Sequence, residues 1–563
     1  MTVSGAQLLV KTIEKLGITY IAGIPGGANL PIYDALRNST IQHILVRHEQ
    51  AAAFVAQGMA RVSRKPAFCM ATSGPGATNL LTAIADAKLD SIPVVAITGQ
   101  VSRHLIGTNA FQEVDICSMA APVVKKSFQI MNAEDIASTV QEAFYLARSG
   151  RPGPVLIDIP RDIQLEMVTM PESNIDEYPV NGNQTFTGMS HFENGNDSIF
   201  CAIENSRKPV LYIGGGIVHS GASDALRAYM LTHKIPAVST LMGLGSIDPE
   251  NPYYLGMLGM HGAQTANLAM EEADLIIGIG VRFDDRATGD IQEFCKKAKF
   301  IHIDIDSNPL KVKKIPDYTW NTDALNALRV INAKTNIEDR TLWFNEILNI
   351  KSQINGISSI LPNNSLLTPQ NIIRSISNFL KPDDIISTDV GQHQMWVAQN
   401  YPFRIPGTFL TSGGLGTMGF GLPVAIGAAL AAPQKTIACI SGDGSILMNI
   451  QELATLAELG LNVKIVIFNN GHLGLVRQQQ NLFFNQKYFA CRFNEAPDFA
   501  QVASGFGISA QKITQKNTLD NLNGELENMM MTPGPFLLDI EINIEENVLP
   551  MVPPGQPNRV MIC

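Results

Sequence analysis

The chain has 563 residues, and only 16% of them are charged although 45% are hydrophobic; soluble domains typically carry about 25% charge. Forty-one basic residues against fifty-one acidic ones give a net charge of −10, which argues against nucleic-acid or anionic-membrane partners because both select for basic patches. The length predicts roughly three or four domains.

The N-terminal region, to about residue 164, alternates short apolar runs with amphipathic helical patterns. An amphipathic helix begins the chain directly, with Ala6, Leu8, Leu9, Ile13 and Leu16 on one face. The predicted strands lie at 18–24, 66–72, 93–99 and 154–160. Strands that alternate with helices in this way predict a parallel sheet covered on both faces.

Two further units repeat this alternation. The second has predicted strands at 209–216, 236–240, 275–280 and 300–306. The third has them at 385–391, 436–444, 463–470 and 535–542. Polar stretches at about 165–195 and 335–367 separate the units. We therefore expect an α/β protein with three doubly wound parallel-sheet domains, at residues 1–165, 190–335 and 366–563.

A long uncharged segment, 405–434, could be mistaken for a transmembrane helix. It is rich in glycine, however, and divides into a loop and a short apolar helix after Pro423, so we expect it to be buried. TSGGLGT at 411–417 weakly echoes TSGPGAT at 72–78. That echo suggests two related domains that handle one ligand, although such turns are common.

The seven cysteines are scattered, and no two stand at CxxC spacing. This pattern indicates reduced thiols rather than a disulfide or zinc framework. No signal or transit pattern precedes the first helix. We therefore expect a cytoplasmic protein without membrane spans.

The strongest chemical signal is Gly442-Asp443-Gly444, followed by the pair Asn469-Asn470 at the end of the next predicted strand. Parallel sheets bind ligands at the carboxyl ends of their strands. Carboxylate and amide oxygens suit Mg²⁺ held together with phosphate oxygens, and the glycines allow backbone N–H groups to approach a diphosphate. Each motif alone would be read as a tight turn, but their spacing favours a joint site.

This pattern resembles the thiamine-diphosphate (ThDP) motif of the ThDP-dependent decarboxylases and carboligases. A second motif agrees, since Glu49 in RHEQAAAF (47–54) lies early in a helix that follows a strand. In that family the matching glutamate hydrogen-bonds the aminopyrimidine and promotes loss of the thiazolium C2 proton. Such a role requires a buried carboxylate with a raised pKa. The plainer alternative is a helix-terminal glutamate paired with Arg47 or Arg61.

Across nearly the whole chain the sequence resembles the acetolactate synthase (acetohydroxyacid synthase) catalytic-subunit family. The stretches that carry the resemblance are GIPGGANLPIYDAL (23–36), GQVSRHLIGTNAFQEVD (99–115), GMLGMHG (256–262), VRFDDRATG (281–289), DVGQHQMW (389–396) and GLGTMGFGLP (414–423). The resemblance implies that pyruvate is decarboxylated on ThDP. The resulting enamine would condense with a second pyruvate, or with 2-ketobutyrate, to give acetolactate or acetohydroxybutyrate on the routes to valine, leucine and isoleucine.

The resemblance also implies a set of cofactor contacts. The diphosphate would meet Val390, Gly391, Gln392, His393, Gly444 and Ser445. Mg²⁺ would be bound by Asp443, Asn470 and the backbone carbonyl of His472. Gly416 and Met418 would receive the aminopyrimidine, with Met418 enforcing the bent cofactor. Gly27, Ala28, Phe111 and Gln112 would come from the other subunit, beside Glu49.

The middle unit would hold a structural FAD with no net redox role. The positions that match the family are Arg151, Gly214, Gly215, Gly216, Arg282, Asp304 and Asp323. The three glycines end a predicted strand and allow close approach to a pyrophosphate. They do not form GxGxxG and would be weak evidence alone.

Arg286 is the residue expected to recognise the second keto acid, with Gln112, because a guanidinium fork matches a carboxylate. The alternative is a surface pair with Asp284 or Asp285. Met260 and Leu475 would line the acceptor pocket. Gln479 stands where most family members have a tryptophan. Its lost packing predicts weak preference for 2-ketobutyrate over pyruvate.

Other departures and open alternatives accompany the resemblance. Arg161 and Ser102 replace a frequent lysine and a frequent proline. Pyruvate oxidase, glyoxylate carboligase and a catalytically silent nucleotide-binding scaffold are the competing interpretations. The resemblance further implies a homodimer or tetramer with active sites between subunits, and a small regulatory subunit.

Overall fold

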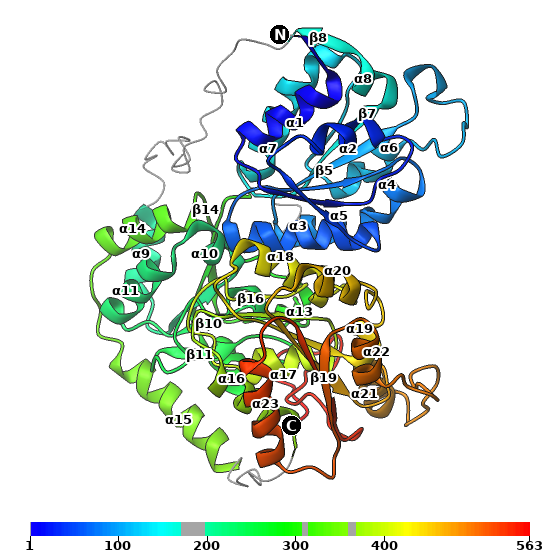
Figure 1. Cartoon of the computed structure of the whole chain (residues 1–563). Helices are drawn as coiled ribbons and strands as arrows, with labels where there is room; N and C mark the ends of the chain where they lie inside the picture. Colours follow the sequence, from blue (N-terminus) through cyan, green and yellow to red (C-terminus); the bar gives the residue numbers. More distant parts are fainter. Residues whose placement is uncertain (1, 170–196, 307–313, 358–366) are drawn as a thin grey trace.

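The computed structural model describes residues 2–169, 197–306, 314–357 and 367–563. These residues form three six-stranded sheets, and every pair of neighbouring strands within each of the three is parallel. Helices cover the sheets, as Figure 1 shows. The predicted class, α/β with three doubly wound parallel sheets, is confirmed.

The N-terminal domain contains the first sheet. Its strands, in spatial order, are β3 (Gln42–Leu45), β2 (Tyr20–Gly23), β4 (Ala67–Ala71), β5 (Val94–Gln100), β7 (Val155–Pro160) and β6 (Lys126–Gln129). The helices are α1 (Gly5–Lys15), α2 (Leu30–Leu36), α3 (Glu49–Ser63), α4 (Pro75–Asn79), α5 (Leu81–Asp90), α6 (Ile116–Ala120), α7 (Ile136–Arg148) and α8 (Arg161–Leu165). A separate antiparallel pair joins β1 (Thr2–Ser4) to β8 (Met167–Thr169).

The middle domain contains the second sheet. Its strands, in spatial order, are β11 (Tyr254–Met257), β10 (Ala237–Ser239), β9 (Pro209–Ile213), β12 (Leu275–Ile279), β13 (Lys299–Asp304) and β14 (Tyr318–Asn321). The helices are α9 (Asp197–Asn205), α10 (Gly215–Ser220), α11 (Ser223–His233), α12 (Gln264–Glu272), α13 (Asp285–Thr288), α14 (Ala324–Lys334) and α15 (Thr341–Ile357).

The C-terminal domain contains the third sheet. Its strands, in spatial order, are β16 (Phe409–Leu410), β15 (Ile385–Thr388), β17 (Ile437–Gly442), β18 (Val463–Asn469), β20 (Phe536–Glu541) and β19 (Ser509–Ile513). The helices are α16 (Pro369–Phe379), α17 (Gln392–Asn400), α18 (Gly421–Ala431), α19 (Asp443–Ile446), α20 (Glu452–Leu459), α21 (Gly474–Phe483), α22 (Phe499–Gly505) and α23 (Leu519–Met531).

The polar stretch after residue 335 contains a helix, α15, that packs on the middle domain. Trp343 and Ile347 are buried in a core cluster of that domain, and the indole N–H of Trp343 donates to the carbonyl of Pro209 at 3.1 Å. We therefore propose that the middle domain continues through α15, beyond the expected boundary at 335. The expected linker at 165–195 lies mostly outside the described residues.

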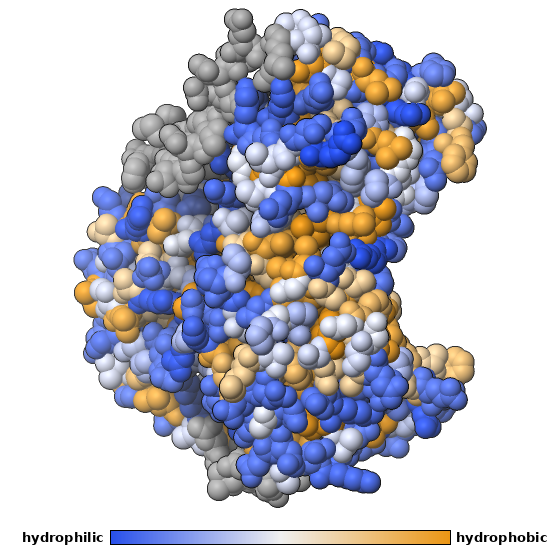
Figure 2. Space-filling view, in the orientation of Figure 1, coloured by the Kyte–Doolittle hydropathy of each residue, from blue (hydrophilic) through white to orange (hydrophobic). Residues whose placement is uncertain are grey.

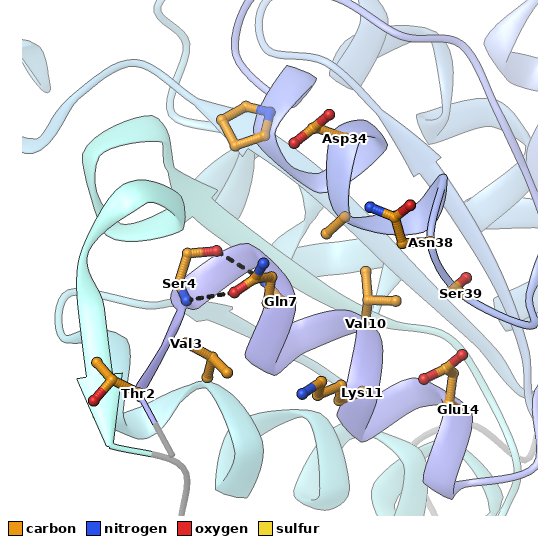
Figure 3. Close-up of a pocket in the computed structure, with 12 residues that line it drawn as sticks. Thr2, Val3, Ser4, Gln7, Val10, Lys11, Glu14, Asp34, Asn38 and Ser39 are labelled. Atoms are coloured by element: carbon orange, nitrogen blue, oxygen red, sulfur yellow. Dashed lines mark hydrogen bonds between the residues drawn. The ribbon is translucent and has the colours of Figure 1, made fainter.

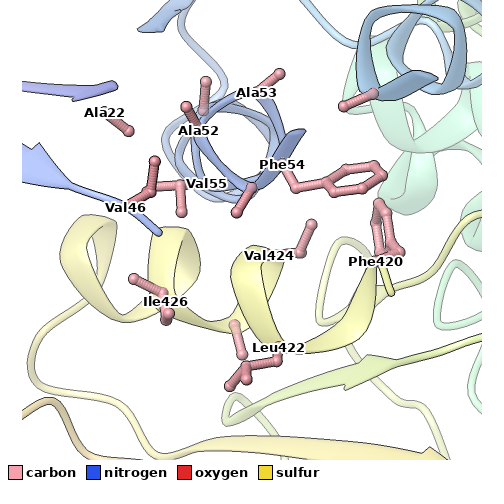
Figure 4. Close-up of a cluster of buried hydrophobic side chains, with 14 of the residues drawn as sticks. Ala22, Val46, Ala52, Ala53, Phe54, Val55, Phe420, Leu422, Val424 and Ile426 are labelled. Carbon is pink, nitrogen blue, oxygen red and sulfur yellow. The ribbon is translucent and has the colours of Figure 1, made fainter. Parts of the chain in front are cut away.

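Helices α3 and α18 pack face to face and join the N-terminal domain to the C-terminal domain (Figures 1 and 4). A Cβ on Gly58 would lie 2.2 Å from the carbonyl oxygen of Val424, and one on Gly427 would lie 2.0 Å from that of Val55. Alanine and glycine are frequent in both helices, and their small size lets the two backbones approach this closely. Phe54 and Phe420 meet edge to face at the end of this contact.

This packing explains the uncharged segment, because ten residues of α18 are buried, from Gly421 to Leu430. Among the described residues, no helix is both long and apolar enough to cross a membrane. The cysteines are all free thiols, and four of the seven are buried.

Candidate active site

Most of the predicted site residues lie near the carboxyl ends of the parallel strands. In the N-terminal domain the segment 72–76, directly after β4, is the centre of one group. A Cβ on Gly76 would lie 3.3 Å from Oε1 of Glu49, and one on Gly74 would lie 2.9 Å from Cα of Gln112. The hydroxyl of Thr72 accepts the N–H of Ala28 at 3.3 Å. We call this group the glutamate cluster.

Glu49 is the first residue of α3 and is half-buried. Its Oε2 accepts a hydrogen bond from the Asn79 amide at 2.9 Å. The alternative pairing with arginine is absent, because Arg47 pairs with Glu458 and Arg61 with Asp90. Full burial was expected and is not seen, since the start of a helix at a sheet edge has one open side in a single chain.

Three positions in or beside the glutamate cluster are strained or exposed. Gln112 has a φ of +59°, which is uncommon for a residue with a side chain. Phe111 is 88% exposed, and a Cβ on exposed Gly27 would meet nothing within 4 Å. Strained backbone and exposed apolar surface often mark functional positions.

A second group lies at the carboxyl ends of β17 and β18, and we call it the carboxylate cluster. Asp443 follows β17, is 3% exposed, and its Oδ2 is buried without a hydrogen-bond partner. Burial raises the pKa of Asp443 to about 7, although the N–H groups of Gly471 and His472 act in the opposite direction. Asn470 lies beside it, where its side-chain oxygen accepts the N–H of His472 at 3.0 Å.

The side chain of Gln392 holds the Asn470 amide in place. Its Oε1 accepts from Asn470 Nδ2 at 3.3 Å, and its Nε2 donates to Gln478 at 2.9 Å and to the carbonyl of Glu546 at 3.0 Å. Only the backbone N–H of Gln392, at the start of α17, is therefore left for a diphosphate. The supporting role of Gln478 was not predicted from the sequence.

His393 is buried in the first turn of α17. Burial lowers the pKa of its imidazole to about 3, so the ring is neutral at physiological pH. Its Nε2 is buried without a partner, while a Cβ on Gly391 or Gly442 would lie 2.9 Å from the ring. These glycines leave open the space that the ring occupies at the ends of β15 and β17.

The remaining predicted cofactor residues of the C-terminal domain lie near the carboxylate cluster and the glycine-rich loop at residues 411–420. Ser445 is buried, and its hydroxyl accepts the N–H of Gly442 at 3.1 Å. A Cβ on Gly444 would lie 2.8 Å from Leu473. Gly416 has a φ of +72° and approaches the Val390 side chain.

Buried carboxylates hold the glycine-rich loop, residues 411–420, which carries Gly416 and half-buried Met418. Asp389 accepts the N–H groups of Gly419 at 2.8 Å and Gly421 at 3.2 Å. Burial raises the pKa of Asp389 to about 6. The sequence did not single out Asp389, although it is the first residue of the DVGQHQMW stretch (389–396).

Carboxylates of the N-terminal domain bind the same glycine-rich loop. Asp90 accepts the N–H groups of Gly413 at 3.1 Å and Gly414 at 2.7 Å. Asp86 accepts the hydroxyls of Ser412 and Thr417. Arg61 donates to Asp90 at 2.8 Å and lies 5.2 Å from the centre of the Phe420 ring.

The expected flavin residues follow four strands of the middle sheet and one loop of the N-terminal domain. Arg151 and Arg282 both donate to the carbonyl of Leu89, at 3.3 Å and 3.0 Å. Asp304 ends β13, and burial raises its pKa. Asp323 caps α14 through the N–H of Leu325 at 2.9 Å, which gives it a structural role.

The three glycines after β9 differ in their surroundings. Cβ atoms on Gly214 and Gly216 would clash with the backbone of Gly280, at 2.3 Å and 2.5 Å. Close packing of two strand ends therefore explains them without a ligand. Gly215 would meet side-chain atoms only, the nearest being Cβ of Met242 at 3.3 Å, so its backbone is the most open of the three.

Arg286 lies in α13, and its side chain is 68% exposed. Its guanidinium contacts Sδ of Met260 at 3.4 Å and the Asp285 carboxylate at 4.0 Å. Asp284 instead caps α13 by accepting the N–H of Ala287. The surface-pair alternative is thus reduced to one long contact, and the guanidinium is open to a ligand.

Leu475 and Gln479 both lie in α21 and are half-buried. Arg161 begins α8 and is exposed, and Ser102 precedes a short 3₁₀ turn.

A pocket of about 340 Å³ lies elsewhere, between β1, α1 and α2 (Figure 3). None of the predicted site residues lines it. Its polar groups bond to the chain itself: Ser4 and Gln7 exchange hydrogen bonds, and Glu14 accepts the N–H of Thr40 at 2.7 Å. The strand-end clusters, rather than this pocket, carry the arrangement suited to chemistry.

Comparisons with known proteins agree with this geometry. The family model described as "Thiamine pyrophosphate enzyme, N-terminal TPP binding domain" matches residues 3–119. The model of the central domain of the same enzymes matches 197–331, and that of the C-terminal TPP binding domain matches 389–540.

Curated relatives match over nearly the whole of this chain. The chain is 44% identical over 560 residues to acetolactate synthase isozyme 1 large subunit of Escherichia coli (strain K12), covering 99% of this chain and 97% of that protein. It is 44% identical to the isozyme 2 large subunit of the same organism, covering 99% of both chains. Identity to acetolactate synthase 1, chloroplastic, of Nicotiana tabacum is 43%, covering 98% of this chain and 83% of that protein.

Matches of this extent, together with the three thiamine pyrophosphate enzyme domains, show that the chain belongs to the acetolactate synthase large-subunit family of thiamine pyrophosphate-dependent enzymes.

Proposed function

We propose that this protein decarboxylates pyruvate and joins the remaining two-carbon unit to a second pyruvate or to 2-ketobutyrate. The products are CO₂ with 2-acetolactate or 2-aceto-2-hydroxybutyrate. The observation that carries the proposal is the carboxylate cluster, where the unpartnered Oδ2 of Asp443 lies next to Asn470 within a chain that matches the family over nearly its whole length. When bound, thiamine diphosphate supplies the electron sink that decarboxylation of a 2-keto acid requires.

The carboxylate cluster fits Mg²⁺. A buried carboxylate oxygen without a hydrogen-bond partner is costly unless a cation or proton satisfies it. Asp443, the Asn470 side-chain oxygen and the carbonyl of His472 together offer the oxygen ligands that Mg²⁺ takes alongside phosphate. Neutral His393 and the N–H groups at the start of α17 would contact the diphosphate.

Glu49 would hold and return a proton through Oε1. Asn79 occupies Oε2, and Gly76 has no side chain to cover Oε1. Gln112 and Arg286 would bind the carboxylate of the acceptor. Met418 and Leu475 would contribute apolar surface that excludes water.

We further propose that the glutamate cluster of one subunit faces the carboxylate cluster of another. In the described part of the chain, no hydrogen bond or ion pair joins Glu49 or Gln112 to Asp443, Asn470 or His472. Large apolar side chains near these clusters are exposed, including Phe111 (88%), Leu415 (43%) and Met448 (53%). Figure 2 shows hydrophobic surface on the hollowed side between the upper and lower parts of the molecule. A homodimer or a tetramer would cover it.

A structural FAD is proposed for the carboxyl edge of the middle sheet. Gly215, at the start of α10, and the two arginines at Leu89 provide donors that suit a pyrophosphate. Asp304 would contact the ribose or adenine. Because Asp323 and the flanking glycines already have structural explanations, the fit rests mainly on Gly215, Arg151 and Arg282.

A small regulatory subunit is proposed because the bacterial relatives are named large subunits. Cytoplasmic location is likewise proposed, and free, largely buried thiols are consistent with a reducing compartment.

The direct test incubates the purified chain with pyruvate, ThDP, Mg²⁺ and FAD, and identifies products by NMR. Acetolactate and CO₂ in equal amounts are expected. Acetate or acetyl phosphate would instead indicate an oxidase, and tartronate semialdehyde from glyoxylate would indicate a glyoxylate carboligase. No product under any of these conditions would favour a silent scaffold and overturn the proposal.

Replacing Glu49 by glutamine tests the proton role. Turnover should fall by about 10²-fold or more, which is typical of removing a general acid–base group, while ThDP affinity changes little. Glu452→Gln is the matched control, because this buried glutamate accepts the N–H of Arg47 at 2.9 Å without belonging to either cluster. Near-normal turnover of the Glu49 variant would refute the role.

A further inference from the structure

The C-terminal tail comprises residues 548–562 (red in Figure 1). Val548, the first residue of the tail, binds helix α21. The N–H of Val548 donates to Oε1 of Gln478 at 2.8 Å, and Nε2 of Gln478 donates to the carbonyl of Val548 at 2.9 Å. Farther on, Met551 and Ile562 exchange backbone hydrogen bonds at 2.9 Å and 2.8 Å. The tail is therefore a closed loop anchored beside Gln479.

The same tail forms hydrogen bonds with the backbone around Arg286. The carbonyl of Arg286 accepts the N–H of Met260, and the carbonyl of Met260 accepts the N–H of Val552, both at 2.8 Å. On the other side of Arg286, Nδ2 of Asn558 donates to the carbonyl of Ala287 at 2.8 Å. The N–H of Asp290 donates to the tail at 3.1 Å.

Glycines make this close approach possible. Gly289 has a φ of +58°, and a Cβ on it would lie 2.6 Å from the carbonyl oxygen of Gln556 and 2.8 Å from Oδ1 of Asn558. Gly259 has a φ of +107°, and its Cβ would lie 2.3 Å from the carbonyl oxygen of Arg286. Both positions require glycine for conformation and for space.

Asn558 is the tail residue whose side chain binds the backbone of α13. It is 1% exposed. The helix α13 has only four residues, so its last carbonyl groups lack partners within the helix, and Asn558 supplies one donor. Arg559, next in the chain, points to Glu271 and Glu293 instead, at 3.2 Å and 2.8 Å, and neither of these residues belongs to α13.

The position of the Arg286 guanidinium depends on this backbone. Its side-chain contacts are the thioether of Met260 and the long contact with Asp285, and neither is strong. A mostly exposed ion pair contributes little. Where the side chain has no firm anchor, the location of its Cα decides how far the guanidinium can reach.

We propose that Asn558 is a positioning residue for Arg286, and that the tail fixes the distance between Arg286 and α21, which carries Leu475 and Gln479. The tail thereby sets the fit of the acceptor keto acid. The inference rests on the proposed role of Arg286 in binding that acceptor. It predicts a defect in acceptor binding that is transmitted through Arg286 alone.

The test measures the KM for 2-ketobutyrate at saturating pyruvate, from the ratio of the two acetohydroxy acids. Asn558→Ala should raise this KM about fivefold, as expected for one lost hydrogen bond, with kcat within about twofold. Arg559→Ala is the neighbouring control and should leave both values unchanged. Asn558→Asp, which keeps the size but replaces the donor by an acceptor, serves if the alanine variant does not fold.

A double-mutant cycle separates this inference from the proposed function. If Asn558 acts through Arg286, Asn558→Ala should add nothing in an Arg286→Ala background. An unchanged KM in Asn558→Ala, or the same fivefold effect in both backgrounds, would overturn the inference. An unchanged KM in Arg286→Ala alone would instead overturn the proposed role of Arg286.

Discussion

The carboxylate of Asp90, in the N-terminal domain, accepts the backbone N–H of Gly414, in the C-terminal domain, at 2.7 Å. The two residues are 324 positions apart in the sequence. Asp90 also accepts the N–H of Gly413 and an N–H of Arg61. One buried carboxylate therefore anchors the loop that carries Gly416 and Met418.

We predict that Asp90→Asn weakens ThDP binding about tenfold or more. Hydrogen bonds to a charged acceptor contribute about 1.5–3 kcal/mol each, and an amide NH₂ directed at these N–H donors would repel them. Titration of the protein with ThDP, followed by intrinsic fluorescence or calorimetry, measures the change.

Asp384→Asn is the matched control for this variant. Asp384 is also buried and accepts two backbone N–H groups, those of Lys381 at 2.8 Å and Thr436 at 3.0 Å, but it does not touch the glycine-rich loop. Both variants should melt at lower temperature. Equal losses of ThDP affinity in the two would contradict a specific role for Asp90.

A pH dependence of Mg²⁺ binding follows from Asp443, whose pKa burial raises to about 7. The raised pKa means that the carboxyl stabilises the metal-free fold in its protonated form and loses that contribution as the pH rises through about 7. Mg²⁺ requires the ionised form. Affinity for Mg²⁺ should therefore rise by nearly tenfold per pH unit below pH 7 and level off above it.

Titration with Mn²⁺ as a paramagnetic probe at pH 5.5 to 8.5 measures this dependence in the presence of ThDP. Asp443→Asn should bind the ion weakly, with a nearly flat profile. Chelation of the metal should release ThDP from the wild-type protein. A wild-type profile without any rise between pH 6 and 7 would show that the proton at Asp443 does not compete with the metal.

The sequence predicted the four inner strands of each parallel sheet and missed both edge strands of each. The inner strands are apolar runs because both of their faces are covered; β5 and β18, for example, are buried at every residue. Edge strands such as β6 and β19 are mostly exposed and polar. The continuous apolar run that indicates a buried strand is thus absent from β6 and β19, and the buried edge strand β16 is too short, at two residues, to form one.

The candidate site was likewise predicted only in part from the sequence. Motifs at strand ends brought Asp443 and Asn470 together, and Glu49 with Gln112, because strand order places those ends at one edge. The supports could not be predicted, because Asp90, Asp86 and the C-terminal tail act on residues hundreds of positions away. No local pattern distinguishes a carboxylate that binds a distant loop from one that faces water.

The contact of α3 with α18 yields a prediction about stability. A Cβ on Gly427 would lie 2.0 Å from a backbone carbonyl, so Gly427→Ala must separate the helices, at a cost of about 3 kcal/mol or more. Gly524→Ala, in the middle of α23 with no atom within 4 Å of the added Cβ, should instead stabilise by up to about 1 kcal/mol. Melting midpoints at one scan rate compare the two; similar shifts would refute the tight contact.

Acceptor preference provides the last prediction, at half-buried Gln479 of α21. A polar amide offers little apolar surface to the extra methylene of 2-ketobutyrate, whose burial is worth about 0.8 kcal/mol. The wild-type protein should therefore show weak preference for 2-ketobutyrate over pyruvate, and Gln479→Trp should raise that preference by about fourfold. Gln479→Ala, which removes the amide without adding apolar surface, is the control and should give no comparable gain. Competition between the two keto acids, followed by the ratio of acetohydroxybutyrate to acetolactate, measures the effect. A strong preference in the wild-type protein would mean that other side chains, with the tail-held Arg286, already pack against the ethyl group.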